Sequence, residues 1–382
     1  DEFFFKHGYA LFNLKRYDEA SKKFYQVKDG TSSYAPLATY YFAHIEYQRG
    51  NLQTALDNLE KVKTHPKFKK IAPYYISQIL YKQGRYDKLL AYAKPLLDST
   101  KIKRRSEIAR LIGDAFYGSK DFEQAIIYLN KAKAPPSRLD ALGEFQLADS
   151  YYKTGVYYDA IRIFSKLSSP NDSIAQLSLY QMADAYLRVD EKTYAKNAFL
   201  SASEMKFYPE LAEDALFNYA KLTYDASFDP YNNAVKAFRK YIRAYPNSPR
   251  VEQAYEYITK VYLSSKNYDQ ALRSIENMGP LNDQLKRAYQ LICYNKATEL
   301  FQNDLHSTAV NYYDRSLKYT VDKELVAKTY FWKAEAFYRT NLFDEAIESY
   351  KEFFYQPTAI LQDEFNEVNY NLGYAYFKLK DY

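Results

Sequence analysis

The sequence is poor in the residues that build reactive sites. Its 382 residues include a single cysteine, Cys293, so an intrachain disulfide is excluded. Cys293 lies in the apolar helical stretch AYQLICYNKA (288–297), where a buried structural thiol is far commoner than a nucleophile. The four histidines are spread over separate segments without the spacing of zinc ligands: His7, His44, His65 and His306. We therefore expect neither a metal site nor a bound cofactor.

Catalytic and phosphate-binding motifs are missing as well. Neither a glycine-rich phosphate loop nor a GxSxG nucleophile motif occurs in a sequence with only 10 glycines. Helical arrays that cleave glycans use a carboxylic acid, and Glu144 and Glu335 are the candidates inside first helices. A structural role is the simpler interpretation of both. The sequence predicts a protein that is not an enzyme, and a catalytic domain outside it is the enzymatic alternative.

Long apolar runs and a strong charge excess are also absent. No run approaches the roughly 18 residues that a membrane-spanning helix needs, so none is expected. The 53 basic residues are interleaved with 47 acidic ones, which leaves a net charge of +6. Two basic clusters, KFKK (67–70) and KIKRR (101–105), each precede a helical segment and are interpreted as solvated approaches to it. This dispersed excess argues against a nucleic-acid partner.

Tyrosine is abundant, with 44 residues, and it follows a pattern that repeats along the chain. In most repeats a small residue is followed twelve positions later by alanine, usually with an aromatic residue three positions before that alanine, as in ADSYYKTGVYYDA (148–160). We number the small anchor residue position 8 of its repeat. The anchors lie 34 to 39 residues apart: Gly8, Ala43, Ser77, Gly113, Ala148, Ala183, Ala220, Thr259, Ala297, Ala334 and Gly373. About eleven repeats therefore tile the sequence.

Each repeat reads as two amphipathic helices joined by a short polar turn. Small residues at positions 8 and 20 would let the two helix backbones approach closely. The pattern predicts an all-α protein in which residues 1–382 form one continuous array. Because the pattern begins inside a helix, at DEFFFKHGYALF, and stops at FKLKDY, we expect the sequence to be a fragment of a longer protein.

The pattern resembles that of tetratricopeptide repeat proteins over the entire chain. YQMADAYLRVDEKTYAKNAFLSA (180–202) carries most of the family's positions, whereas the tryptophan favoured at position 4 is missing throughout and Leu89 replaces the alanine of the third repeat. The resemblance implies a right-handed superhelical α-solenoid that serves as a protein–protein interaction scaffold. The insertion DASFDPYNNA (225–234) and the link GPLNDQLKRA (279–288) are where we expect the superhelical twist to change.

Two segments show a finer resemblance. FRKYIRAYPNSPRVEQAYEYITKVYLSSKNYDQAL (238–272) is similar to repeats of bacterial envelope proteins that assist outer-membrane assembly and cell-division coordination. KIAPYYISQILYKQGRYDKLLAYAKPLL (70–97), together with RRSEIARLIGDAFY (104–117), is similar to the long repeat arrays of Bacteroidetes envelopes. The resemblance implies a location in the periplasm or at the periplasmic face of the outer membrane, with the cytoplasm as the alternative.

In the family that the sequence resembles, positions 5, 9, 12 and 13 of the first helices point into a concave groove. Positions 5 and 12 are each aromatic in nine of eleven repeats, and seven residues, two helical turns, separate them on one stripe. The predicted partner-binding residues are Tyr40, Tyr74, Phe145, Tyr180, Phe217, Tyr294 and Phe331 at position 5, His44, Gln78, Asp114, Asp149 and Asp184 at position 9, and Tyr47, Tyr81, Tyr117, Tyr152, Tyr224, Phe301 and Tyr338 at position 12.

Tyrosine suits a binding surface because its ring gives contact area at little cost in rotamer entropy and its hydroxyl keeps a hydrogen bond. We predict that this groove binds a peptide or protein segment of apolar or mixed character. Two alternatives stay open. The rings simply pack on one another between repeats, or they stack on sugars in a glycan-binding envelope protein.

Overall fold

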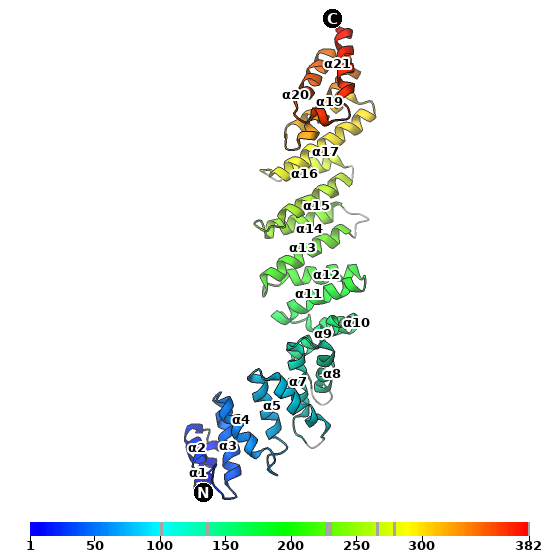
Figure 1. Ribbon diagram of the computed structural model, residues 1–382. Helices are drawn as coiled ribbons and strands as arrows, with labels where there is room; N and C mark the ends of the chain where they lie inside the picture. Colours follow the sequence, from blue (N-terminus) through cyan, green and yellow to red (C-terminus); the bar gives the residue numbers. More distant parts are fainter. Residues whose placement is uncertain (100–101, 134–137, 226–230, 265–266, 278–279, 381–382) are drawn as a thin grey trace. The chain divides into compact units, whose positions relative to one another are not determined.

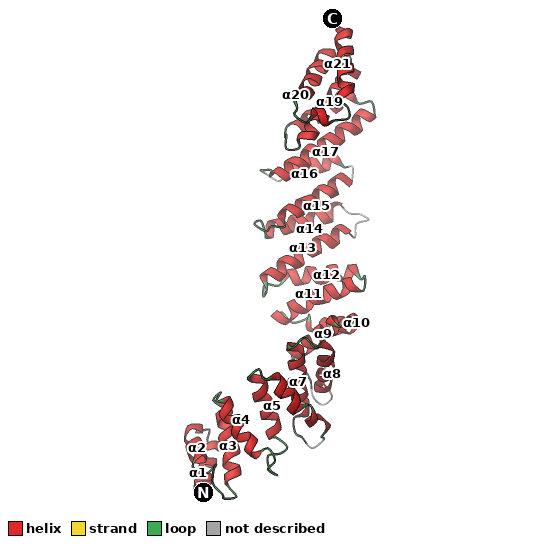
Figure 2. Ribbon diagram, viewed as in Figure 1, coloured by secondary structure: helices red, strands yellow, loops and turns green. Residues whose placement is uncertain are grey.

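The computed structural model describes residues 1–99, 102–133, 138–225, 231–264, 267–277 and 280–380. Within these ranges there are 21 α-helices and no strand (Figure 2). Two short 3₁₀-helices, η1 (Pro95–Asp98) and η2 (Ala359–Leu361), lie in connections between helices. The all-α fold predicted from the repeat is confirmed.

Every anchor residue lies in the first of two paired helices. The first helices are α1 (Glu2–Asn13), α3 (Ala35–Gln48), α5 (Ala72–Lys82), α7 (Arg105–Gly118), α9 (Ala141–Lys153), α11 (Ser173–Arg188), α13 (Pro209–Asp225), α15 (Val251–Ser264), α17 (Asp283–Gln302), α19 (Lys323–Arg339) and α21 (Phe365–Leu379). The second helices are α2 (Tyr17–Tyr25), α4 (Leu52–Val62), α6 (Tyr86–Ala93), α8 (Phe122–Lys133), α10 (Tyr157–Leu167), α12 (Lys192–Glu204), α14 (Tyr231–Ala244), α16 (Tyr268–Glu276), α18 (His306–Leu317) and α20 (Phe343–Tyr355).

The chain divides into two compact units, which we describe separately. The N-terminal unit, Asp1–Tyr208, holds α1 to α12, and the C-terminal unit, Pro209–Tyr382, holds α13 to α21 (Figure 1). Inside each unit a second helix packs against its own first helix and against the next one. The two segments expected to change the twist, 225–234 and 279–288, fall partly outside the described residues.

The core of each repeat is built where its two helices come closest. The position-20 alanines, together with Leu89 in the third repeat, have no exposed surface. At position 8, a Cβ added to Gly113 would lie 2.8 Å from the Leu129 side chain of α8. A larger residue at this position would therefore overpack the helix pair, which confirms the close approach predicted from the small residues.

The turn between the two helices has the same backbone in every repeat where it is described. Position 15 is left-handed, with φ between 59° and 84°, at Lys15, Gly50, Gly84, Lys120, Gly155, Asp190, Asp304, Asn341 and Lys380. The amide of position 16 then donates to the carbonyl of position 11, for example Asn51 to Glu46 at 2.9 Å. This Schellman closure places the side chains of positions 12 and 17 on opposite sides of one tight turn.

Buried glutamines secure the connections that lead to two of the next repeats. Gln176 donates to the carbonyls of Ala202 and Met205 at 3.1 Å and accepts from the amide of Tyr208 at 2.8 Å. Gln290, at the same repeat position, donates to the Asp322 carbonyl and accepts from the Asp322 amide, both at 3.0 Å. These bonds supply partners to backbone groups that would otherwise be buried without them.

Candidate functional site

The position-12 tyrosines of the N-terminal unit connect successive first helices. The Tyr47 hydroxyl on α3 donates to Gln78 on α5 at 2.7 Å, and the Tyr117 hydroxyl on α7 donates to Asp149 on α9 at 2.8 Å. Tyr152 on α9 donates in the same way to Asp184 on α11. In all three pairs the acceptor is the position-9 side chain of the next repeat. The predicted neighbours of the tyrosine row are thus its hydrogen-bond partners.

The rings of Tyr81, Tyr117 and Tyr152 also pack against position 17 of their own repeats, across the turn. The ring centroids are 5.7 Å apart for Tyr81 and Tyr86, 5.8 Å for Tyr117 and Phe122, and 5.7 Å for Tyr152 and Tyr157. The Tyr117 and Tyr152 pairs meet edge to face, a favourable arrangement for aromatic rings. The position-12 rings are therefore half-buried: one side is fixed by the fold, and the other stays accessible.

The position-5 rings pack toward the second helix of their own repeat. Centroid distances are 5.6 Å for Phe145 and Phe164, 5.5 Å for Tyr180 and Phe199, 5.0 Å for Phe217 and Tyr241, 6.1 Å for Tyr294 and Tyr313, and 6.3 Å for Phe331 and Phe353. Phe217 and Phe331 are buried, with 4% and 2% of their surface exposed, and Tyr74 keeps only 6%. Because the second helix covers them, Phe217 and Phe331 offer a partner almost no surface.

The first predicted residues along the chain, Tyr40 and His44, are half-buried among other rings. Tyr40 stacks on Phe68 with centroids 4.1 Å apart, and His44 meets Tyr75 edge to face at 5.3 Å. Burial lowers the pKa of the His44 imidazole. Because a lowered pKa favours the uncharged ring, His44 behaves at neutral pH as one more packed aromatic residue rather than as a cation.

In the C-terminal unit the position-12 rings contact aromatic rings of the following repeat. Tyr224 on α13 meets Tyr257 on α15 at 5.1 Å. Phe301 on α17 meets Trp332 on α19 at 5.3 Å. Tyr338 lies 6.2 Å from Tyr374 of α21. The N-terminal unit has such ring contacts as well, since Tyr47 meets Tyr75 of α5 at 5.6 Å between ring centroids, in addition to its hydroxyl link to Gln78.

Lysines at position 13 lie over two rings of the N-terminal row. The Lys82 ammonium is 4.6 Å from the centroid of the Tyr47 ring, and the Lys153 ammonium is 5.3 Å from that of Tyr152. Position 13 of the repeat between them is Gly118, where an added Cβ would meet nothing within 4 Å. The surface beside Tyr117 is consequently open.

Arg110 departs from the aromatic position-5 row and reaches the next repeat. Its Nε donates to Asp114 at 2.6 Å, and its two terminal nitrogens donate to Asp140 at 2.7 Å and to Gln146 at 3.1 Å. A Cβ at Gly143 would lie 1.6 Å from one of these nitrogens, so the guanidinium lies directly on the Gly143 backbone. The sequence signal was a break in the row at 110 combined with a glycine in the first turn of α9.

Arg110 changes the titration of the two carboxyls that it holds. Burial raises the pKa of Asp114, and its ion pair with Arg110 only partly offsets this effect. Burial also acts to raise the pKa of Asp140, but the Gly143 amide and Arg110 outweigh it, so the pKa of Asp140 is lowered. Asp140 is also the N-cap of α9, where a negative charge is favourable.

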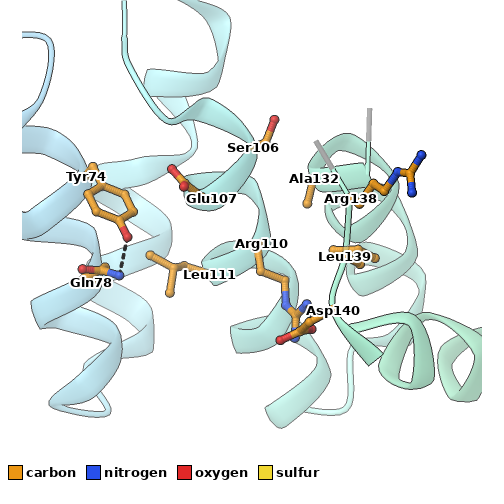
Figure 3. A pocket seen from close by; sticks show the side chains of 10 residues that line it. All are labelled: Tyr74, Gln78, Ser106, Glu107, Arg110, Leu111, Ala132, Arg138, Leu139 and Asp140. Atoms are coloured by element: carbon orange, nitrogen blue, oxygen red, sulfur yellow. Dashed lines mark hydrogen bonds and ion pairs between the residues drawn. The ribbon is translucent and has the colours of Figure 1, made fainter. Parts of the chain in front are cut away.

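A cavity of about 480 Å³ opens on the first-helix side of α5 and α7 (Figure 3). Tyr74 and Gln78 of α5 form one side, residues from the beginning of α7 form the middle, and the start of α9 forms the other side. The lining is Tyr74, Gln78, Ser106, Glu107, Arg110, Leu111, Ala132, Arg138, Leu139 and Asp140. The Arg138 guanidinium turns away from the cavity.

The described residues show no other grouping that suggests chemistry. None of them form a group of three or more His, Cys, Asp or Glu side chains suited to a metal ion. Among the described helices, none is both long and apolar enough to span a membrane. The two candidate acids have structural partners: Glu144 accepts from Lys133 at 2.7 Å, and buried Glu335 accepts from Tyr350 and from Asn371, the latter at 2.6 Å.

Comparison with protein-family models gives one consistent description. A model described as a tetratricopeptide repeat matches residues 74–138 and 294–353, and a second model of the same description matches residues 214–248. The matched ranges lie in both compact units. No curated protein matches the chain.

Solved structures are similar in fold. The C-terminal part of a TPR repeat-containing protein from Cytophaga hutchinsonii is 22% identical, with a TM-score of 0.50, over 65% of this chain and 98% of that one. A tetratricopeptide repeat protein from Parabacteroides merdae is 15% identical, with a TM-score of 0.40, over 67% and 98% of the two chains. YrrB, described as a TPR protein with an unusual peptide-binding site, is 16% identical, with a TM-score of 0.41, over 47% and 91%. At 22% sequence identity, the similarity to the Cytophaga structure supports the fold alone.

Proposed function

Because the chain is a tetratricopeptide repeat protein, we propose that it is a non-catalytic scaffold that binds an extended protein segment on the first helices of its N-terminal unit. Proteins of this fold are generally interaction scaffolds. The observation that supports this choice of surface is the half-buried tyrosine row of α3 to α9, with the cavity open beside it on the same face. We call the surface formed by Tyr47, Tyr81, Tyr117 and Tyr152 the tyrosine face.

The tyrosine face has the properties that a segment-binding surface needs. Its rings are held in place by Gln78, Asp149, Asp184 and the position-17 rings, so little entropy is lost when a partner orders them. Because the hydroxyls already donate to side chains of the next repeat, the rings mainly offer apolar surface. A partner segment of apolar or mixed character fits this surface best.

No contact favours the glycan-binding alternative. Sugar stacking needs flat, open ring faces, whereas Tyr117 and Tyr152 meet their position-17 rings at interplanar angles of 69° and 61° and share their hydroxyls with aspartates. The packing alternative is correct in part, since every ring of the face does support the fold. The proposal concerns the side of each ring that the fold leaves accessible.

The experiment must block the tyrosine face without dismantling the repeats. Replacing the tyrosines by alanine would remove packing as well as surface, so Gly118→Trp is the better variant because an added side chain there meets open space. The matched control is Ser201→Trp at an exposed position of α12, a second helix. Peptides are first selected from a phage-displayed random library against the unmodified protein.

We expect Gly118→Trp to weaken binding of the selected peptides at least about tenfold, because an indole would cover the surface beside Tyr117. Ser201→Trp should leave binding unchanged. Fluorescence polarisation measures both affinities, and circular dichroism verifies the helicity of each variant. Unchanged affinity in the Gly118→Trp protein would show that the tyrosine face is not the binding surface.

We also propose that the protein resides in a bacterial envelope, as part of an assembly there. This proposal is supported only by the resemblance of residues 70–97 and 238–272 to envelope repeat arrays. Fractionation of the organism of origin provides the test, since a protein recovered only with the cytoplasm would contradict an envelope location.

A further inference from the structure

The cavity beside the tyrosine face occurs where one repeat departs from the pattern. In nine of eleven repeats position 5 is aromatic, and such rings pack toward the second helix of their own repeat. Arg110 instead extends toward α9, as Figure 3 shows, and the space between Tyr74 and Leu139 remains open. Gly143 makes this course possible, since any side chain there would collide with the guanidinium. The cavity therefore distinguishes the repeat of Arg110 from the other repeats of the same surface.

The walls of the cavity are mixed in character: Leu111, Ala132, Leu139 and the Tyr74 ring supply the apolar surface, and the remaining lining residues are polar or charged. The Arg104 guanidinium lies 4.0 Å from the centroid of the Tyr74 ring and covers part of that ring. Gln78 donates to the Tyr74 hydroxyl at 2.5 Å and accepts from Tyr47 at 2.7 Å, so its amide is already used. A volume of about 480 Å³ lies within the range of small-molecule sites and accommodates one large side chain.

Arg110 determines which kind of side chain fits. Three of its five N–H groups donate to Asp114, Asp140 and Gln146. These bonds hold the guanidinium in a fixed position on the cavity wall. Flat guanidinium surfaces stack on aromatic rings.

Charge argues against ionic occupants. An incoming carboxylate would find Arg110 already paired with Asp114 and Asp140. An incoming ammonium group would find these two carboxylates paired in the same way, and Glu107 paired with Arg104 at 2.7 Å. A neutral ring competes with none of these pairs and also buries against Leu111 and Leu139.

We propose that this cavity is an anchor pocket for one neutral aromatic side chain of the bound segment, stacked on Arg110. The inference rests on the proposed function, because an anchor pocket serves a segment that lies along the tyrosine face. A single pocket of this kind sets the register of the segment, which the repeating tyrosines cannot do by themselves.

The test uses a small probe, so that it does not depend on knowing the partner. N-acetyl-L-tryptophanamide is titrated into protein with ¹³C-labelled leucine methyl groups, and the methyl resonances of Leu111 and Leu139 are followed. N-acetyl-L-leucinamide is the matched apolar probe. We expect saturable shifts at both leucines with a dissociation constant on the order of 1 mM for the tryptophan amide, and at least about fivefold weaker binding of the leucine amide.

Two variants examine the geometry of the pocket. Ser106→Trp, on the cavity wall, should fill the space and abolish the shifts, while Ser201→Trp should leave them unchanged. Arg110→Lys retains the charge and an ion pair with Asp114 but removes the flat guanidinium, and it should weaken the tryptophan amide about fivefold.

Three results would overturn the inference: no saturable shift at Leu111 and Leu139, equal affinity for the two amides, or unchanged affinity in the Arg110→Lys protein. These failures are distinct from a failure of the proposed function. If Gly118→Trp blocks the selected peptides but the amide does not bind, the tyrosine face stands and the anchor pocket is refuted. If the tryptophan amide binds but the selected peptides bind the Gly118→Trp protein with unchanged affinity, the pocket exists but the proposed course of the segment is wrong.

Discussion

In both compact units position-12 rings contact rings of the following first helix, and in the N-terminal unit tyrosine hydroxyls also link these helices. In the N-terminal unit the hydroxyls of Tyr47, Tyr117 and Tyr152 donate to the following repeat. In the C-terminal unit Tyr224 and Phe301 contact aromatic rings of the following repeat. Hydrogen bonds depend on direction, whereas ring contacts depend chiefly on area and shape.

Position 9 of the next repeat explains the difference. Gln78, Asp149 and Asp184 are acceptors, so a tyrosine hydroxyl finds a partner there. In the C-terminal unit Lys260 occupies this position opposite Tyr224, and Phe301 has no hydroxyl to donate to Glu335, which accepts from Tyr350 of its own repeat. A hydroxyl link of this kind therefore needs both a tyrosine at position 12 and an acceptor at position 9 of the next repeat.

Raising the pH should produce the largest loss of stability, and it should do so in both units. Burial raises the pKa of Tyr41 in the N-terminal unit to about 12, and Tyr9 makes a smaller contribution. Burial also raises the pKa of Tyr241 in the C-terminal unit to about 12, with a smaller contribution from Glu213. An unfolded tyrosine ionises near pH 10. The stability contributed by these groups is fully present below pH 10 and is lost as the pH rises toward 12.

We accordingly expect a steep loss of helicity between about pH 10 and 12, measured by circular dichroism together with tyrosinate absorbance. Hydroxyl links such as Tyr117 to Asp149 should break in the same range, since burial and the aspartate charge both raise the pKa of Tyr117. A tyrosine titration that is complete near pH 10 without unfolding would contradict the burial of these side chains.

The next largest effect is expected from Gly143→Ala. The added Cβ would displace the Arg110 guanidinium and leave Asp114 and Asp140 without their cation. We expect a loss of about 3 kcal/mol from the broken ion pairs, offset by about 1 kcal/mol of helix propensity, hence a net loss of about 2 kcal/mol. Urea denaturation monitored by circular dichroism measures the change.

Gly118→Ala is the matched control, because its Cβ would meet open space and the free energy of unfolding should stay unchanged or rise slightly. Equal stabilities of the Gly143→Ala and Gly118→Ala proteins would show that Arg110 does not lie on the Gly143 backbone.

Tyr117→Phe directly compares the two kinds of link. Removing the hydroxyl leaves Asp149, which is only 5% exposed, without its donor at a cost of about 2 kcal/mol. Tyr338→Phe in the C-terminal unit should change the free energy of unfolding by less than about 0.5 kcal/mol, because the described residues give that hydroxyl no hydrogen bond and its ring contacts remain. Similar losses in the two variants, measured by urea denaturation, would contradict the distinction between the units.

The smallest expected change concerns the turn that the two units share. Lys120 in the N-terminal unit and Asn341 in the C-terminal unit are left-handed at φ 63° and 59°. Glycine adopts this conformation without strain, so Lys120→Gly should raise the free energy of unfolding by about 1 kcal/mol, and Asn341→Gly by less because asparagine tolerates the left-handed region. Thermal melts of both variants provide the measurement. A destabilised Lys120→Gly protein would mean that its left-handed backbone carries no strain.

The repeat pattern predicted the helices and their pairing because its small and apolar residues recur with the period of an α-helix. It indicated the left-handed turn only where glycine stands, as at Gly84, because lysine, aspartate or asparagine occupies the same position in most other repeats. Periodicity also placed positions 5 and 12 on one stripe without showing that second helices bury Phe217 and Phe331. Burial depends on the neighbouring helix, which a single repeat does not encode.

The candidate site was predicted in outline and changed in detail. Gln78, Asp149 and Asp184 were expected beside the tyrosine row, but their role as acceptors from the preceding repeat requires the register between repeats. In the sequence Arg110 only interrupts the aromatic row of position 5. Its contact with Gly143, 33 residues further along the sequence, could not be predicted because it joins two different first helices.

Hydrogen–deuterium exchange of the protein with and without a selected peptide tests the central claim most directly. If the tyrosine face binds the segment, added protection should be confined to first helices of the N-terminal unit, chiefly α5, α7 and α9, where bound peptide slows local opening. The second helices of that unit and the helices α13 to α21 should exchange as before. Protection confined to second helices or to the C-terminal unit, with α5, α7 and α9 unchanged, would contradict the account.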